Sequence, residues 1–148
     1  MEVYHLGLTR FARQLTGEGA KLFGGRWNLI GCPCIYTAES KALSVLEYAA
    51  NVLLEQMPED LSFTAYEIPA DSWSLFSSSQ LPCNWADTPP VGTAEWGTKQ
   101  LQENLAIRVP SVIIPSEFNY ILNPLHPDFK KVQIKEVASF TFDNRIKK

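Results

Sequence analysis

An arginine follows a pair of glycines in the segment from Gly17 to Asn28, which reads GEGAKLFGGRWN. Gly24 and Gly25 can adopt positive φ and let a ligand approach the backbone closely. Arg26 offers a planar set of donors that suits phosphate or carboxylate groups. The segment predicts an anion-binding site. The alternative is a glycine-rich hairpin whose arginine pairs with a surface carboxylate and whose Trp27 fills a core.

Two further candidate residues follow at intervals of ten and eleven positions, Tyr36 and Glu47. Tyr36 lies in a run rich in β-branched and aromatic residues, 33–38, which predicts a strand. Ser40 is a good N-cap, and the spacing after it predicts a helix through Leu54 that Pro58 ends. Its apolar stripe comprises Ala42, Leu43, Leu46, Ala49, Ala50, Leu53, Leu54 and Met57. Glu47 falls on the margin of this stripe, so we expect it to be partly buried.

A half-buried carboxylate needs a partner or a function, because desolvation disfavours its charged form. Glu47 could form a structural salt bridge with Arg26, or it could simply reach solvent. Both residues could instead act on one ligand, since perturbed carboxylates are frequent at functional sites. The spacing of these residues leaves the alternatives open.

The order and spacing of several motifs resemble the RES domain family, which is named for an arginine, a glutamate and a serine. The motifs are GEGA, GGRWN, IYTAES, LE, VPS at 109–111 and LNP at 122–124. The resemblance extends from Val3 to about Arg145. It assigns the family arginine to Arg26, a site tyrosine to Tyr36, the glutamate to Glu47 and the serine to Ser111.

Two positions depart from the pattern of many relatives. His5 stands after an aromatic residue where an arginine is common, which puts substrate affinity in question. Asn51 stands where a histidine is common, on the predicted helix.

RES domains are the toxin halves of many bacterial toxin–antitoxin pairs, and they are similar to ADP-ribosyltransferase folds that consume NAD. The resemblance therefore implies an α+β fold, a single compact domain over residues 1–148 with a central mixed or antiparallel sheet flanked by helices. It implies NAD as substrate, phosphate as a candidate co-substrate, and no further cofactor or metal. It also implies an antitoxin of the Xre type that blocks the pocket, and hence a homodimer or a hetero-oligomer with that antitoxin.

The chemistry of NAD cleavage suggests a role for each residue. Breaking the nicotinamide–ribose bond passes through an oxocarbenium-like state, which a carboxylate such as Glu47 stabilises while it holds the ribose hydroxyls. Arg26 would bind the pyrophosphate or an incoming phosphate through charge-assisted hydrogen bonds. Tyr36 would contact the nicotinamide ribose, and Ser111 would donate to a phosphate or carboxamide. The family motifs add Trp27, Asn28 and Asn123 as substrate-binding residues.

Tyr36 and Ser111 also have purely structural interpretations. Tyr36 could be a tyrosine packed in a sheet, and Ser111 could be a serine that caps a strand after Pro110.

The acceptor of the ADP-ribose group is open at this point. Phosphate would make the enzyme an NAD phosphorylase and water a glycohydrolase, while a protein acceptor would make it an ADP-ribosyltransferase. The competing function is a binding module in which the arginine and glutamate are structural and a nucleotide is held without turnover.

Composition narrows the function classes further. A chain of 148 residues with 45% apolar content suits one domain with a real core. We expect a cytoplasmic protein, because the sequence shows neither a leader nor an apolar run long enough to span a membrane. A net charge of −3 argues against direct nucleic-acid binding.

The histidines and cysteines give no sign of another kind of active site. The two histidines, His5 and His126, are far apart in the sequence and do not support the acid–base pair of a ribonuclease. The cysteines, which lack the paired spacing of zinc sites, are expected to be reduced: Cys32, Cys34 and Cys83.

The remaining patterns predict the elements around these residues. Alternation over 61–68 predicts a strand, and residues 92–103 predict a helix with Trp96 and Leu101 inward. An apolar strand is expected at 109–114, with Ser111 near its start. Alternation from Val132 to Phe142 predicts one or two half-buried strands. Residues 72–90 are the least regular part, a long loop with a short helix that could border the pocket or meet a partner.

Overall fold

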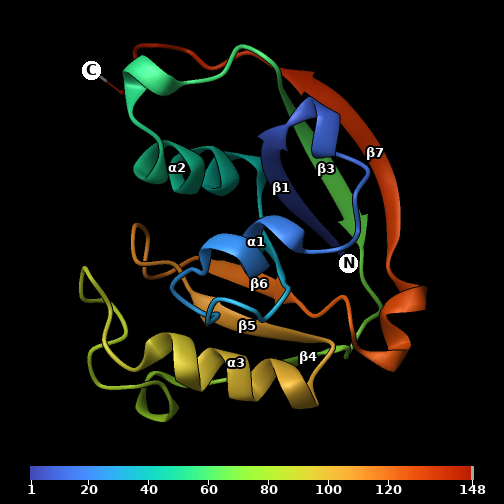
Figure 1. Cartoon of the computed structure of the whole chain (residues 1–148), viewed down its shortest axis with the longest axis vertical. Coiled ribbons are helices and arrows are strands. Elements are labelled where there is room, and N and C mark those ends of the chain that lie inside the picture. The colour runs from blue at the N-terminus through green and yellow to red at the C-terminus, as the bar shows by residue number, and fades with distance from the viewer. Residues whose placement is uncertain (148) are drawn as a thin grey trace.

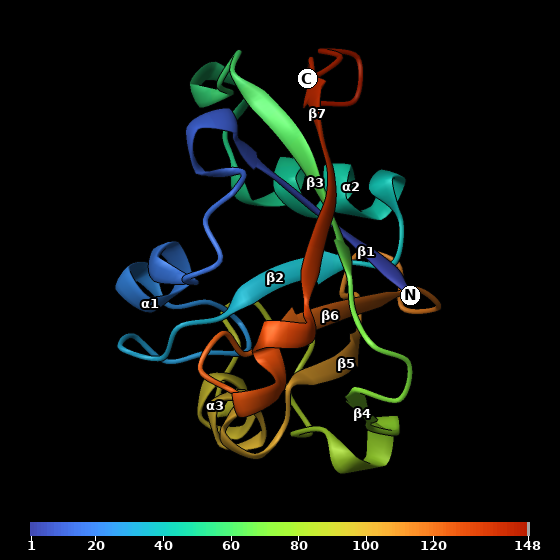
Figure 2. The same ribbon diagram turned by 90° about the vertical axis from the view of Figure 1, so that its right-hand side faces the viewer.

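A computed structural model describes residues 1–147, and within them seven strands form one mixed sheet in the order β4-β5-β6-β2-β1-β3-β7. The strands are β1 (Glu2–Leu8), β2 (Ile35–Ala38), β3 (Leu61–Glu67), β4 (Trp73–Leu75), β5 (Ala106–Pro110), β6 (Phe118–Leu122) and β7 (Gln133–Phe140). Neighbouring strands are antiparallel except β4 and β5. Figure 2 shows the strong twist of the sheet, in which β7 runs across the direction of β6. The predicted α+β class with a central mixed sheet is confirmed.

The described residues form three α-helices, α1 (Glu18–Phe23), α2 (Lys41–Asn51) and α3 (Thr93–Glu103). Short 3-10 turns occupy Thr9–Phe11, Leu54–Gln56, Ser78–Gln80 and Pro127–Lys131. Helix α2 contacts β1 and β2, while α3 contacts β5 (Figure 1). The two longer helices therefore cover different halves of the twisted sheet. No helix among residues 1–147 is long and apolar enough to cross a membrane.

The helix that carries Glu47 is shorter than predicted. Ser40 caps it as expected, because its Oγ accepts a hydrogen bond from the N–H of Leu43 at 3.0 Å. The helix ends at Asn51 rather than Leu54, and Val52 is already extended. Lys147 lies at this end and its Nζ donates to the carbonyls of Ala49 and Val52, which satisfies acceptors that a helix terminus leaves open. Three members of the predicted stripe are exposed rather than buried: Ala42, Ala50 and Leu53.

Most of the other predicted elements are confirmed. The strand at 61–68 is β3, the helix at 92–103 is α3, and the alternating C-terminal segment is β7. The strand predicted at 109–114 is wrong beyond Pro110, where β5 ends. The hydroxyl of Ser111 accepts hydrogen bonds from the N–H groups of Ile113 and Ile114, and this turns the chain out of the sheet.

The core lies on both faces of the sheet: a cluster that includes Val3, Ile35 and Tyr66 covers one face, and the clusters under α2 and α3 share the other. Under α2, Leu6 and Leu61 of the sheet pack with Val45 and Ala49 of the helix. Under α3, Leu101 packs with strand residues and with Trp27, which is 2% exposed. The loop that carries Arg26 is thus attached to the core through its neighbour Trp27.

Candidate active site

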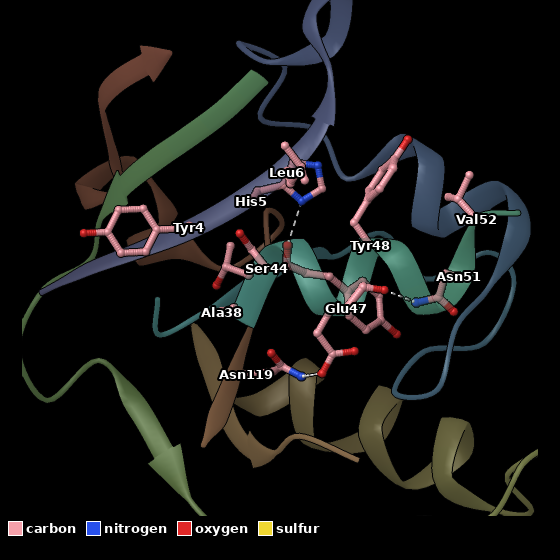
Figure 3. A pocket seen from close by; sticks show the side chains of 12 residues that line it. Tyr4, His5, Leu6, Ala38, Ser44, Glu47, Tyr48, Asn51, Val52 and Asn119 are labelled. Carbon is pink, nitrogen blue, oxygen red and sulfur yellow. Dashed lines mark hydrogen bonds between the residues drawn. The ribbon is translucent and has the colours of Figure 1, made fainter. Parts of the chain in front are cut away.

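A cavity of about 250 Å³ lies between α2 and strands β1, β2 and β6. Residues 4–6 of β1 and 36–38 of β2 form one wall, and α2 supplies the side facing them. Asn119 of β6 lines the cavity beside Glu47 (Figure 3). The volume is below the roughly 300–1,000 Å³ usual for a whole small-molecule ligand. The cavity therefore suits one end of a larger ligand.

Glu47 lies in this cavity and is half-buried, as predicted. Its Oε1 accepts hydrogen bonds from Ser111 Oγ at 2.8 Å and from Asn119 Nδ2 at 2.6 Å. Figure 3 shows its second oxygen turned away from Asn119. The structure thus brings the family glutamate and serine together and leaves one carboxylate oxygen for a ligand.

Ser111 is fully buried just after the end of β5. Besides donating to Glu47, it accepts from two backbone N–H groups at 3.0 and 3.1 Å. Its hydroxyl proton is therefore committed to the glutamate. The predicted contact of Ser111 with a phosphate or carboxamide stays a prediction, and it requires Ser111 to exchange its present partner.

Arg26 is held by a loop and not by Glu47. Its Nη1 donates to the carbonyls of Trp85 and Asp87, both at 2.7 Å, and its Nη2 lies 3.4 Å from Thr88 Oγ1. Across residues 1–147, no salt bridge joins Arg26 to Glu47, so the structural ion pair considered above is not formed. The guanidinium fixes residues 85–88, which belong to the irregular segment expected to border a pocket.

The glycines before Arg26 form a tight turn. Gly24 has φ of 68°, and Gly25 pairs with Asn28 in an isolated bridge. A side chain at Gly25 would lie 2.5 Å from the hydroxyl of Tyr36. The close approach that this glycine permits is thus to Tyr36 of the same chain.

Asn28 fixes the loop from inside. It is 1% exposed, and its Nδ2 donates to the carbonyls of Ala20, Leu29 and Cys32. Its Oδ1 accepts from the hydroxyl of Tyr36 at 2.7 Å. All of these partners lie within the chain, so the predicted role of Asn28 in substrate binding stays a prediction.

Trp27 packs between two other tryptophans. Its ring centroid lies 6.2 Å from that of Trp85, nearly stacked, and 5.7 Å from that of Trp96, edge to face. Its backbone N–H donates to the hydroxyl of Tyr36 at 3.0 Å. Trp27 therefore anchors the loop on α3 and on the 85–88 segment, and a direct contact with substrate stays a prediction.

Burial and the neighbouring Cys34 raise the pKa of Tyr36 well above its usual value, so Tyr36 is a neutral phenol at physiological pH.

We expect Tyr36→Phe to lower the free energy of unfolding by about 1–3 kcal/mol, because it leaves Asn28 Oδ1 and the Trp27 N–H without their partner. Urea unfolding measures this change. Tyr4→Phe is the control, since the Tyr4 hydroxyl donates to an exposed Glu2 and its loss should cost below about 0.5 kcal/mol. Equal losses in the two variants would contradict the anchoring role of Tyr36.

His5 lines the same cavity and donates from Nδ1 to the Tyr36 carbonyl at 2.8 Å. Burial lowers the pKa of His5, an effect that this hydrogen bond only partly offsets. The imidazole is therefore neutral at pH 7 and brings no positive charge to the cavity.

Asn123 lies away from Glu47, at a second cavity of about 570 Å³ that is also lined by Leu29 and His126. Its Nδ2 donates to the Leu101 carbonyl at 2.5 Å and its Oδ1 accepts from the N–H of Leu125 at 2.9 Å. These bonds connect α3 to the loop after β6. The structure does not bring Asn123 to the glutamate, and its predicted role in substrate binding is untested.

The cysteines are free thiols, and burial raises the pKa of Cys34. Over the described range, no group of three or more histidine, cysteine, aspartate or glutamate side chains is arranged to hold a metal ion.

Asn119 is the site residue that sequence reasoning missed. A polar residue in a short apolar segment, FNYIL, reads equally well as part of a loop. The alternation of side chains along a strand could have identified it, because in a strand over these residues Asn119 and Ile121 lie on the same face.

The whole chain is similar to known proteins. The family model of the RES domain matches residues 2–143. A protein named Toxin Res from Photorhabdus laumondii is 34% identical over 153 residues, which cover 100% of this chain and 98% of that protein. The Prs ADP-ribosylating toxin of Sphingobium sp. is 34% identical over 144 residues, or 91% and 88% of the two chains.

A solved structure shows the same fold. A chain in the crystal structure of the M. tuberculosis MbcT–MbcA toxin–antitoxin complex matches with a TM-score of 0.74 and 19% identity. The match covers 95% of this chain and 84% of that chain.

Proposed function

Because the chain belongs to the RES domain family, we propose that it is a toxin-type enzyme that depletes NAD by cleaving the nicotinamide–ribose bond. The observation that supports this proposal most directly is the Glu47 carboxylate, which lies half-buried in the cavity with one oxygen held by two neutral donors. A fixed negative charge of this kind stabilises a sugar cation.

In the proposed reaction the bond between the ribose C1′ and the nicotinamide nitrogen breaks, and its electron pair stays on nicotinamide. Nicotinamide leaves as a neutral molecule, so the site needs no general acid. The oxocarbenium-like ribose is stabilised by Glu47 until an oxygen nucleophile bonds to C1′. Phosphate gives ADP-ribose phosphate, whereas water gives ADP-ribose and a proton.

The size of the cavity suits the nicotinamide riboside end of NAD, and Arg26 would bind the pyrophosphate outside it. Arg26 now donates to two loop carbonyls, so binding would exchange these neutral acceptors for charged phosphate oxygens. Phosphate oxygens carry a negative charge and fit the guanidinium in a bidentate arrangement, so they add an ion-pair attraction that the carbonyls lack, which favours the exchange. The substrate would then release residues 85–88 from Arg26.

We prefer a small acceptor, phosphate or water. Transfer of ADP-ribose to a protein is the second candidate, because the Sphingobium relative is named as an ADP-ribosylating toxin of Prs. The same bond breaks in both cases, and only the incoming nucleophile differs.

An antitoxin is the proposed partner. The structural neighbour was solved as a toxin–antitoxin complex, and the RES family resemblance suggests an antitoxin of the Xre type that blocks the cavity. An enzyme that depletes NAD would require such an inhibitor in the cell that makes it.

Incubation of the purified protein with NAD, with and without phosphate, tests the proposal. Mass spectrometry is expected to show nicotinamide release, with ADP-ribose phosphate formed only when phosphate is present. Phosphate-independent ADP-ribose would identify a hydrolase. Intact NAD under both conditions, and in the presence of cell lysate as a source of protein acceptors, would refute NAD cleavage and favour a binding module.

A further inference from the structure

Asn119 makes the shortest hydrogen bond to the Glu47 carboxylate, 2.6 Å from Nδ2 to Oε1. It lies within β6, where its backbone is paired with Ala38 of β2 on one side and Val109 of β5 on the other. A residue held between two strands has little freedom to move. The amide therefore approaches Glu47 from a rigid platform, opposite the helix that carries the glutamate (Figure 3).

We propose that Asn119 is a positioning residue for NAD cleavage, which together with Ser111 fixes Oε1 of Glu47 so that the other oxygen faces the ribose. This inference rests on the function proposed above. One hydrogen bond would let the carboxylate turn about that contact. A second donor, Ser111 in the turn that follows β5, removes this freedom and sets the plane of the carboxylate.

The neutral character of both donors is essential to the argument. An arginine or lysine in the place of Asn119 would fix the carboxylate equally well but would offset its negative charge. That charge is what stabilises the developing oxocarbenium ion. In the part of the chain that the structure describes, no salt bridge involves Glu47, so an amide and a hydroxyl orient it while its charge remains available.

The test compares the steady-state kinetics of NAD cleavage in Asn119→Ala and Asn119→Asp with those of the wild-type protein. We expect kcat of Asn119→Ala to fall by about 10–100-fold while KM for NAD changes less than about three-fold, because the contact matters most in the transition state. Asn119→Asp keeps the size of the side chain but places a second carboxylate against Glu47. Its acid limb in the pH–kcat profile should move up by about one pH unit or more.

Asn104→Ala is the matched control, because that asparagine also makes two side-chain hydrogen bonds, to Ser74 and Gln100, remote from the cavity. It should lose stability but keep kcat. Thermal melting identifies any variant that does not fold, in which case the other Asn119 variant decides. The positioning role would be overturned if the wild-type protein cleaves NAD and a folded Asn119 variant has kcat within about three-fold of the wild-type value and an unshifted pH profile. Absence of cleavage in the wild-type protein would overturn the proposed function instead.

Discussion

Glu47→Gln is expected to lower kcat for NAD cleavage by about 10³-fold while the protein keeps its fold. Glutamine has the size and shape of glutamate, and its amide oxygen can still accept hydrogen bonds from Ser111 and Asn119. What disappears is the negative charge beside the ribose. Because that charge acts on the transition state, the loss should appear in kcat more than in KM for NAD.

Nicotinamide release, followed by mass spectrometry, measures this effect. Glu55→Gln is the control, since Glu55 is an exposed glutamate in the 3-10 turn just after α2 and its charge does not face the cavity. The control should keep wild-type turnover. Near-UV circular dichroism verifies that both variants are folded. Wild-type turnover in a folded Glu47→Gln protein would remove Glu47 from the mechanism.

The local part of this site follows from the sequence, and its long-range part does not. The cap at Ser40 and the apolar spacing after it predict the helix and the half-burial of Glu47, because both depend on residues close in the chain. The contacts with Ser111 and Asn119 join residues 64 and 72 positions apart. Spacing carries no information about such pairs, so only the family resemblance pointed to Ser111.

Four elements were not predicted, α1, β1, β6 and β4, and each depends on tertiary contacts. Strand β4 falls in the segment 72–90 that was expected to be a loop, and it forms by pairing with β5. Helix α1 has only six residues, includes Gly19 and starts after Gly17 in the left-handed region, all of which favour a loop. Its backbone is held by Asn28, which binds the Ala20 carbonyl. The short strand β6 contains Asn119, and β1 carries no turn signal at its ends. Both are defined by their neighbours in the sheet.

The partner of Arg26 could not be predicted either. Its residue type indicated an anion, whereas the structure shows backbone carbonyls of Trp85 and Asp87. A guanidinium binds either kind of acceptor, and the choice depends on which loop folds over it. The irregular segment 72–90 gave no pattern from which its path could be derived.

Gly97→Ala is expected to destabilise the protein by about 3 kcal/mol, the largest stability effect that we predict. In the interior of a helix this substitution normally stabilises by about 0.5–1 kcal/mol. Here a Cβ atom would collide with the carbonyl oxygen of Trp27 and lie 2.8 Å from its carbonyl carbon. Backbone atoms cannot rotate away as a side chain can. Trp27 is also fixed by its ring contacts with Trp85 and Trp96.

Gly19→Ala is the matched control, because it is also a helical glycine and a Cβ there would meet no atom within 4 Å. The control should leave the melting temperature unchanged or raise it slightly, whereas Gly97→Ala should lower it by about 6–12 °C. The same collision would push Trp27 away from α3 and displace its neighbour Arg26, so NAD cleavage by the residual folded protein should also fall. An unchanged melting temperature in Gly97→Ala would mean that the Trp27 backbone can retreat from α3. The position of Arg26 would then be set by the 85–88 loop alone, and it would shift whenever substrate displaces that loop.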